Sequence, residues 1–293
     1  MDKRIIILGA SGFIGNYVYK SFLSDMIFDV KGFSSKNCDL LSSDKIQNKL
    51  SFISKDDVVI MASAITRLRE NTFDSMVKNI QMADNISKFI EKNGAGYFIF
   101  LSTVDVYGLV DDTTIISEKL LPNPNDYYAV SKLASEFLLK KTCDRNNIPI
   151  LTLRLSGVYG SGKQEKTTIN KLIESATRNK EVILYGDGKD KRDYIYVDDV
   201  CNIIKKAIEQ KINATLNVAT GNSCSISEIV EIIKKCCTDK FVVNYKQREN
   251  ITEERVKDMV YDVSLLTTLF PDIKIKDLKE GISIIFKSAY GKC

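Results

Sequence analysis

Residues 4–15 of the chain, RIIILGASGFIG, decide the fold. The stretch begins with a short apolar run, which is typical of a strand buried on both faces of a parallel sheet. Gly9, Gly12 and Gly15 follow in the spacing G-x-x-G-x-x-G. They lead into residues 13–24, whose pattern is that of a helix. The sequence therefore predicts a strand, a glycine-rich turn and a helix in immediate succession.

The glycine-rich turn has the features of a phosphate-binding loop. Glycines permit a tight turn and let the backbone approach a pyrophosphate closely, while the helix N-terminus offers amide donors and the positive end of a dipole. A simple strand-to-helix turn is the alternative, but it does not require three glycines in register. We therefore expect a dinucleotide here, contacted by Gly9, Ser11, Gly12, Phe13, Ile14 and Gly15.

The first half of the chain continues to alternate apolar runs with longer amphipathic segments. Continuous Ile, Val and Leu runs separated by helices indicate strands covered on both faces, which is the pattern of a parallel sheet. Right-handed crossovers wind such units into a doubly wound, Rossmann-like α/β fold. Further strands are predicted at residues 28–33, 57–61, 97–102 and 148–155, and further helices at 72–92 and 127–141.

The rhythm changes after about residue 155, where loop-like and turn-rich stretches begin. A later strand is predicted at 214–219, and helices at 225–235 and about 276–288. We therefore expect a large nucleotide-binding domain and a smaller C-terminal domain. The first comprises residues 1–155 with about 190–220, and the second about 156–189 and 221–293.

Composition argues against several classes of protein. Lysine and arginine number 42 against 38 acidic residues, and these charges are scattered, so nothing marks a nucleic-acid partner. Hydrophobic residues make up 44% of the chain, enough for a sizeable core, yet no run approaches the ~18 apolar residues of a membrane span. The apolar run before Gly9 is too short for a signal peptide. We expect a soluble, cytoplasmic protein.

Cysteine usage agrees with that expectation. The seven cysteines are irregularly spaced, with no C-x-x-C pair, and the chain has no histidine at all. A zinc site is therefore not expected, and we assign no metal ligand. Free thiols in a reducing compartment are the expected state of the cysteines.

The end of the second predicted strand bears on the choice of dinucleotide. A carboxylate here would bind the ribose hydroxyls of NAD. The chain instead has Ser34, Ser35 and Lys36, whose hydroxyls and ammonium suit a 2′-phosphate, so we favour NADP(H) and keep NAD(H) as the alternative. An ordinary solvated turn would explain the same residues. Asp39 and Leu40 head a predicted helix, where Asp39 either caps the helix or accepts a bond from adenine.

The stretch NDYYAVSK, residues 125–132, offers proton chemistry to a chain without histidine. Tyr128 and Lys132 are four residues apart on the predicted helix and share a face, whereas Tyr127 lies roughly 100° away. An ammonium beside a phenol favours the phenolate, which lowers the pKa of the tyrosine from about 10. Tyr128 is then usable as an acid or a base. The alternative is a half-buried aromatic with a surface lysine beside it.

Four motifs occur in order along the chain: the glycine pattern, FLSTVDVYG at 100–108, YYAVSK at 127–132 and KRDYIYVDDV at 191–200. Together they make about residues 4–285 resemble the extended short-chain dehydrogenase/reductase family. Within that family the resemblance is to the NAD(P)-dependent nucleotide-sugar epimerases, dehydratases and reductases. It implies that the smaller domain binds the substrate, a nucleotide-diphosphate sugar.

The resemblance implies a catalytic set of Thr103, Tyr128 and Lys132. Tyr128 is the acid or base, Lys132 holds the nicotinamide ribose and tunes Tyr128, and Thr103 hydrogen-bonds the reacting sugar oxygen. A hydride passes between the nicotinamide and a sugar carbon while Tyr128 handles the proton. Thr103 follows the end of a predicted strand, where ligands bind in a doubly wound sheet.

Further residues match the family position by position. The resemblance places Ala62, Ser63, Ala64 and Asn79 beside the cofactor. It assigns the substrate contacts to Thr103, Asp105, Arg192 and, more weakly, Arg255. Arg192 would bind the diphosphate through its fork of donors. A salt bridge from Arg192 to Asp193 or Asp198 is the alternative.

The chain also departs from the family pattern. Val104 stands where dehydratases have an acid, so dehydration is not expected, and Gly157 and Ser161 replace a family Asn and Pro. We favour a 4-keto-6-deoxy nucleotide-sugar reductase that uses NADPH. A nucleotide-sugar 4-epimerase with tightly bound NAD, a reductase of an unrelated small carbonyl compound and a non-catalytic dinucleotide-sensing regulator stay open. The resemblance further implies a homodimer formed through the helices at 72–92 and 127–141.

Overall fold

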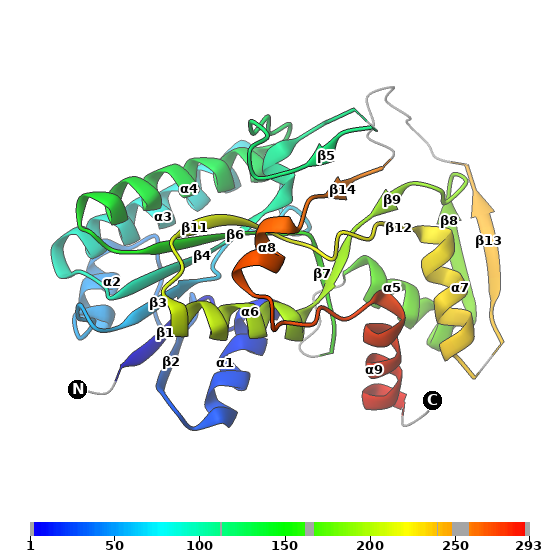
Figure 1. Cartoon of the computed structure of the whole chain (residues 1–293), viewed down its shortest axis with the longest axis horizontal. Helices are drawn as coiled ribbons and strands as arrows, with labels where there is room; N and C mark the ends of the chain where they lie inside the picture. The colour runs from blue at the N-terminus through cyan, green and yellow to red at the C-terminus, as the bar shows by residue number, and fades with distance from the viewer. Residues whose placement is uncertain (1–2, 112, 162–166, 239, 248–257, 291–293) are drawn as a thin grey trace. The chain divides into compact units, whose positions relative to one another are not determined.

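The computed structural model describes residues 3–111, 113–161, 167–238, 240–247 and 258–290 (Figure 1). The chain forms two compact units. The first is built from Met1–Gly108, Leu121–Leu155 and Cys201–Leu216, and the second from Leu109–Leu120, Ser156–Val200 and Asn217–Cys293. Within the described residues, no helix is both long enough and apolar enough to cross a membrane.

A six-stranded sheet organises the first unit, in the strand order β11-β6-β4-β3-β1-β2. Its neighbouring strands β2, β1, β3, β4 and β6 pair in parallel. The direction of winding reverses between β1 and β3, so the loops that follow these two strands lie at the switch point, where doubly wound sheets bind ligands. The strands are β1 Arg4–Leu8, β2 Asp29–Phe33, β3 Val58–Met61, β4 Tyr97–Thr103, β6 Ile150–Leu155 and β11 Ala214–Val218.

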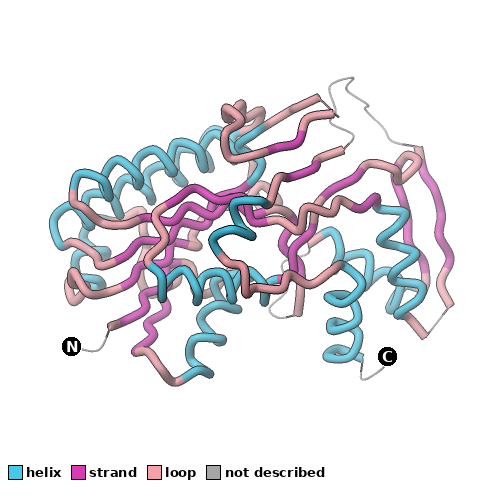
Figure 2. The backbone as a smooth tube through the Cα atoms, viewed as in Figure 1, coloured by secondary structure: helices cyan, strands magenta, loops and turns pink. Residues whose placement is uncertain are grey.

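Helices cover both faces of this sheet (Figures 1 and 2). One face carries α2, α3 and α4, and the other carries α1 and α6. An ion pair of 2.8 Å between Lys205 and Asp25 joins α6 to α1. The bounds are α1 Phe13–Asp25, α2 Ser43–Leu50, α3 Phe73–Asn93, α4 Tyr127–Arg145 and α6 Val197–Gln210.

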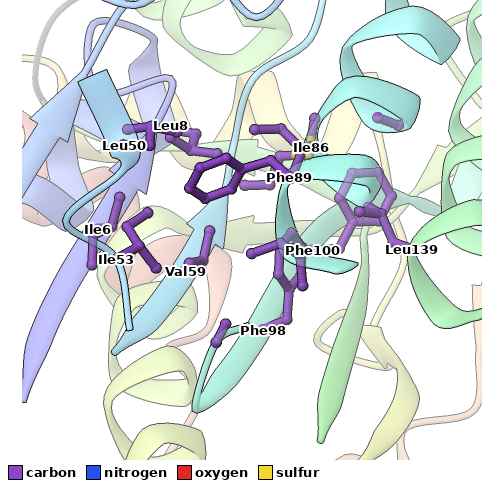
Figure 3. Close-up of a cluster of buried hydrophobic side chains, with 14 of the residues drawn as sticks. Ile6, Leu8, Leu50, Ile53, Val59, Ile86, Phe89, Phe98, Phe100 and Leu139 are labelled. Atoms are coloured by element: carbon purple, nitrogen blue, oxygen red, sulfur yellow. The ribbon is translucent and has the colours of Figure 1, made fainter. Parts of the chain in front are cut away.

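Alternate strand residues make the core beneath α2, α3 and α4 (Figure 3). Successive side chains of a strand point to opposite faces, so Ile6 and Leu8 of β1 face the same helices as Phe98 and Phe100 of β4. These side chains pack against apolar residues of the three helices, among them Leu50, Ile86, Phe89 and Leu139. This burial packs α4 against the sheet.

The second unit consists of small sheets and four helices within its described part. Its core gathers around the buried residues Tyr159, Ile169, Ile229 and Ile282. Each sheet has two strands: β10 with β7, β12 with β9, β13 with β8, and β14 with β5. The strands are β5 Ile115–Ile116, β7 Gly157–Tyr159, β8 Glu181–Tyr185, β9 Lys191–Arg192, β10 Tyr194–Tyr196, β12 Cys224–Ser225, β13 Val242–Lys246 and β14 Val260–Tyr261. The helices are α5 Thr168–Glu174, α7 Ile226–Cys236, α8 Ser264–Leu269 and α9 Leu278–Tyr290.

The expected Rossmann-like α/β fold is confirmed, since a parallel sheet lies between two layers of helices. Two details differ from the sequence-based expectation. Helix α6 was not predicted, although it follows the KRDYIYVDDV motif directly. The predicted capping role of Asp39 is wrong, because α2 starts later, and Ser42 caps it by accepting a bond from the backbone amide of Lys45.

Candidate dinucleotide-binding and catalytic site

Two of the three loop glycines are required by the fold itself. Gly9 has a φ of +95°, and a β-carbon there would lie 2.7 Å from the Ser63 backbone nitrogen. A β-carbon on Gly15 would lie 2.3 Å from the Gly9 carbonyl oxygen, closer than atoms can approach. Both glycines therefore let the start of α1 lie directly against the end of β1.

Gly12 differs from its two neighbours. Its φ of −75° suits any residue, and a β-carbon there would meet only the Gly9 carbonyl oxygen, at an ordinary 3.5 Å. Gly12 is the N-cap of α1, where no side chain caps the helix and no acidic residue occupies the first turn. By contrast, α3 and α4 have side-chain caps, Thr72 and Asp126. The bare backbone at Gly12 and the uncapped amides fit a pyrophosphate.

The turn after β2 is held by a residue that the motif reasoning missed. The side-chain oxygen of Asn37 accepts bonds from the Ser34 backbone nitrogen, at 2.6 Å, and from the Ser34 hydroxyl, at 3.2 Å. Ser35 and Lys36 are exposed on this turn. Serine and asparagine commonly close such turns through local side-chain bonds, so the sequence carried a signal for Asn37.

Asp39 and Leu40 follow this turn but differ in character. The carboxylate of Asp39 accepts a bond of 3.1 Å from the Leu41 backbone nitrogen and lies 3.9 Å from the Lys45 ammonium. The Leu40 side chain is buried in the core, and its carbonyl oxygen accepts a bond of 2.9 Å from Asn85. Leu40 therefore shapes the site through its backbone and its packing.

Ala62, Ser63 and Ala64 form the loop after β3, directly against the glycine loop. The Ala62 backbone nitrogen donates to the Leu8 carbonyl over 2.8 Å, which joins the ends of β1 and β3. Asn79 of α3 is buried, and its amide group bonds both the nitrogen and the carbonyl of Ile65, at 2.8 and 3.0 Å. It also donates to the Ser131 hydroxyl over 3.1 Å. In this arrangement Asn79 ties the loop to α4.

Thr103 is the last residue of β4, and its hydroxyl accepts a bond of 3.2 Å from the Asp105 backbone nitrogen. Thr103 thereby caps a 3₁₀ turn at Val104–Tyr107. Arg67, which sequence reasoning did not single out, lies 3.5 Å from the Asp105 carboxylate and 3.8 Å from that of Asp126. Arg67 therefore links the loop after β3 to the segment after β4 and to the start of α4.

Tyr128 is the second residue of α4 and is half-buried. Its backbone nitrogen donates over 3.0 Å to the side chain of Asn71. Tyr127 is 46% exposed, and its ring meets the Phe73 ring edge-on with 6.5 Å between centroids. The helical register thus separates the two tyrosines, as the spacing indicates.

Lys132 is a buried lysine, only 3% exposed. Its ammonium donates to the Leu101 carbonyl oxygen over 2.5 Å and lies 4.0 Å from the centre of the Phe100 ring. Burial lowers the pKa of Lys132 from 10.5 to about 7, and the negative charge of Glu136 opposes this shift. The alternative of a surface lysine at this position is therefore wrong.

Behind Lys132 lies a buried polar cluster that the motifs did not reveal. Glu136, one turn further along α4, accepts a hydrogen bond from the Ser102 hydroxyl of β4. It also accepts three bonds from Nε and Nη2 of Arg154 on β6, the shortest being 2.8 Å. The Arg154 guanidinium lies 4.9 Å from the centre of the Tyr107 ring. The one signal for this cluster in the sequence is the four-residue spacing of Lys132 and Glu136, which places them on the same helical face.

Arg192 is the candidate substrate residue that the structure describes in the second unit. Arg192 ends β9 and donates to the Lys191 carbonyl oxygen over 2.7 Å. Asp193 is buried and accepts bonds from the Thr220 nitrogen and hydroxyl, at 2.8 and 3.0 Å. Arg255 lies outside the described residues. The described part of the chain holds no group of acidic residues and cysteines arranged to bind a metal ion.

The contrast between Gly12 and Gly15 yields a prediction. We expect Gly12→Ser to keep the stability of the protein, because serine is a good N-cap and has room there, but to weaken NAD(P) binding at least about tenfold by blocking the backbone. Gly15→Ala should instead destabilise the fold by roughly 1–3 kcal/mol through overpacking. Urea unfolding and cofactor titration separate the two. Equal losses of stability in both variants would contradict the assignment.

The burial of Lys132 yields a second prediction. Between about pH 7 and pH 10 the unfolded chain holds a proton on this lysine that the folded chain has lost, so folding stability should rise with pH over this interval. Relative to Lys132→Met, the free energy of unfolding of the wild type should rise by up to about 1.4 kcal/mol per pH unit. Urea unfolding at a series of pH values measures this difference between the two proteins. A difference that does not change with pH would show that folding leaves the pKa of Lys132 unchanged.

The model of the NAD dependent epimerase/dehydratase family matches residues 5–219. A curated relative, GDP-6-deoxy-D-talose 4-dehydrogenase of Aggregatibacter actinomycetemcomitans, is 28% identical over 295 residues, covering 97% of each chain.

Solved structures agree in fold. UDP-glucose 4-epimerase of Thermotoga maritima, solved with UDP-glucose, has a TM-score of 0.85 at 22% identity and covers 97% of both chains. UDP-glucuronic acid 4-epimerase of Bacillus cereus, solved with UDP-glucuronic acid and NAD, has a TM-score of 0.79 at 26% identity, over 97% of this chain and 98% of that one. The family resemblance and the expectation of an NAD(P)-dependent enzyme are therefore confirmed. With most of its length matched, this chain belongs to the NAD dependent epimerase/dehydratase family.

Proposed function

We propose that the chain is an NADPH-dependent reductase of a 4-keto-6-deoxy nucleotide sugar. The observation that carries the proposal is the placement of Tyr128 and the buried Lys132 on one face of α4, with Thr103 at the carboxyl end of β4. Carboxyl ends of strands near the switch point are where a doubly wound sheet binds its ligands. A phenol and an amine on consecutive helical turns supply proton transfer without histidine.

The proposed roles are those that the family resemblance implies, and the positions of the side chains support them. When bound, a dinucleotide would supply a hydride to the sugar carbonyl carbon; the loop Gly9–Gly15 would hold its pyrophosphate and Lys132 its ribose. Tyr128 donates the proton that converts the sugar carbonyl oxygen to a hydroxyl. Thr103 hydrogen-bonds that oxygen and orients it. The ammonium of Lys132 stabilises the phenolate that Tyr128 leaves behind.

The name of the curated relative favours a reaction at the sugar C4 that results in net oxidation or reduction. A 4-dehydrogenase of a 6-deoxy sugar nucleotide, operating in reverse, is a 4-keto reductase. Val104 supplies no acid next to Thr103, which argues against a dehydratase. A 4-epimerase that oxidises and re-reduces the same carbon on a retained NAD is the second candidate, and the UDP-sugar epimerases of the same fold support it.

The cofactor preference and the substrate contacts are part of the proposal. Ser34 and the exposed Lys36 support NADP(H) through a 2′-phosphate, while the 26%-identical epimerase was solved with NAD. For the nucleotide-diphosphate sugar we propose Arg192 on the diphosphate and Asp105 near the sugar. We propose that the first unit binds the cofactor and that the second contributes to substrate binding. The buried thiols Cys38 and Cys143 support a cytoplasmic location.

A panel of nucleotide sugars tests the proposal directly. With NADPH we expect stoichiometric cofactor oxidation by one 4-keto-6-deoxy nucleotide sugar, followed by absorbance and by NMR of the product. Tyr128→Phe should lower kcat by at least about a hundredfold and leave cofactor affinity within about twofold, because only the proton donor is lost. The matched variant Tyr127→Phe should stay near wild type. Epimerisation of a UDP-sugar without net NADPH consumption would establish the second candidate instead.

We also propose that the protein is a homodimer through α3 and α4, which pack along each other. Their outer residues Phe73, Val77, Tyr127, Val130 and Phe137 are exposed, and the last is 68% exposed. Apolar side chains in such numbers on one helix pair are typical of a covered surface.

Substitution of one exposed phenylalanine tests the dimer. Phe137→Glu places a charge in the proposed interface, so the protein should elute as a monomer in size-exclusion chromatography with light scattering. Leu23→Glu, at an exposed position of α1, serves as the control and should leave the mass unchanged. A monomeric wild type, or a Phe137→Glu variant of unchanged mass, would refute this interface.

A further inference from the structure

Glu136 ties helix α4 to two adjacent strands of the sheet. Its carboxylate accepts a bond from the Ser102 hydroxyl, one residue before Thr103 at the end of β4. The same carboxylate accepts from Nε and from Nη2 of Arg154 on β6, the latter at 2.8 Å. All three side chains are buried, with exposures of 4% for Ser102, 7% for Glu136 and 6% for Arg154. The position of this helical turn is therefore set by charge-assisted bonds as well as by packing.

Glu136 also stands directly behind the catalytic candidates. Tyr128, Lys132 and Glu136 follow one another at intervals of four residues on α4 and share a face. From β4, the Phe100 ring and the Leu101 carbonyl contact Lys132. On its own helix, Tyr128 and Glu136 stand one turn before and one turn after it, and the charge of Glu136 acts on the ammonium. Arg154 of β6 and Tyr107 of the 3₁₀ turn stand beyond Glu136. Among these groups Glu136 carries the one carboxylate.

We propose that Glu136 is a positioning residue for the Tyr128–Lys132 pair, its carboxylate fixing their helical face against β4 and β6 and supplying a counter-charge to the Lys132 ammonium. The inference rests on the proposed function in one respect, since it takes Lys132 as the catalytic lysine. It adds Ser102 and Arg154 as the groups that hold Glu136 in place. None of these three side chains touches the reacting atoms in this proposal.

The opposite end of the sheet offers a matched comparison. Asp57, just before β3, accepts bonds from Nε and Nη2 of Arg4, at 2.9 and 2.7 Å. It also accepts from the Ser54 hydroxyl over 3.0 Å, and it is only 1% exposed. Both sites thus consist of a buried carboxylate, an arginine fork and a serine. Asp57 lies at the amino end of its strand, away from the candidate site, so Asp57→Asn reports the structural loss alone.

The counter-charge is tested first without any substrate. In urea unfolding, we expect Glu136→Gln to destabilise the protein more when Lys132 is present than in a Lys132→Met background. At pH 6, where most folded Lys132 carries its proton, this excess should reach at least about fivefold in the unfolding equilibrium constant, because a neighbouring opposite charge shifts a pKa by about one unit or more. The excess should vanish by about pH 9 to 10, where folded Lys132 is neutral in both proteins.

The control pair is Asp57→Asn with and without Lys132→Met, for which we expect no excess at either pH. The proposal would be overturned if Glu136→Gln showed no extra destabilisation at pH 6 in the presence of Lys132, or if that extra destabilisation did not change with pH. An equal excess for Asp57→Asn would overturn it as well. None of these outcomes depends on the substrate, so a wrong proposed function would leave this test intact. If Glu136→Gln alone fails to fold, the double variant Glu136→Gln/Arg154→Met removes both partners of the pair and carries the same comparison.

Catalysis provides the second test once a turnover assay exists. Glu136→Gln should lower kcat at least about tenfold at pH 8 with KM nearly unchanged, and should move the alkaline fall of the kcat profile to lower pH by about one unit. Asp57→Asn should leave both the profile and kcat near wild type. An unshifted profile for Glu136→Gln would refute the counter-charge, and an unchanged kcat would refute the positioning role.

Discussion

The contact between Gly15 and the carbonyl of Gly9 is the constraint on which the rest of the candidate site depends. No residue with a β-carbon fits at Gly15, since that carbon would lie 2.3 Å from the carbonyl oxygen. The contact lets α1 begin immediately after β1 and turns its first amides toward the switch point of the sheet. Ala62 and Ser63 close the other side, because the Ala62 nitrogen pairs with the end of β1. Packing between two glycines thus leaves the first amides of α1 uncapped and leaves Gly12 free of any structural demand.

Much of this was predictable from local sequence. Strands covered on both faces are continuous apolar runs, so β1, β3, β4 and β6 fell close to their expected positions. Helix α6 was missed because its first residues were assigned to a motif, although Val200, Ile203, Ile204 and Ala207 recur with helical spacing and are all buried. The prediction that Asp39 caps α2 was wrong for a different reason. Serine and aspartate are both good caps, and composition alone does not say which of them begins α2.

The polar cluster at Glu136 lay beyond local reasoning. Its partners Ser102 and Arg154 are separated from it by 34 and 18 residues, and strand pairing alone brings them together. Periodicity marks Glu136 as a residue on the Lys132 face but cannot say that an arginine from β6 reaches it. The loss of hydration on burying both charges offsets much of the attraction between them. The pair therefore adds little net stability and instead favours one arrangement of the helix and strands. Arg4 and Asp57 form the same kind of pair at the other end of the sheet.

A chain without histidine needs another group that titrates near neutral pH, and burial creates one here. An exposed lysine would stay protonated near neutral pH, and its neighbours would not change its charge. Buried Lys132 has its pKa lowered to about 7, so its charge is decided by what stands next to it. Within the described structure that neighbour is Glu136, one turn behind, while Tyr128 lies one turn ahead. Because one rigid helix carries all three, a displacement of α4 would change the charge of the amine and the reach of the phenol together. The bonds that hold α4 to β4 and β6 therefore bear on the proposed chemistry of the site as much as on its fold.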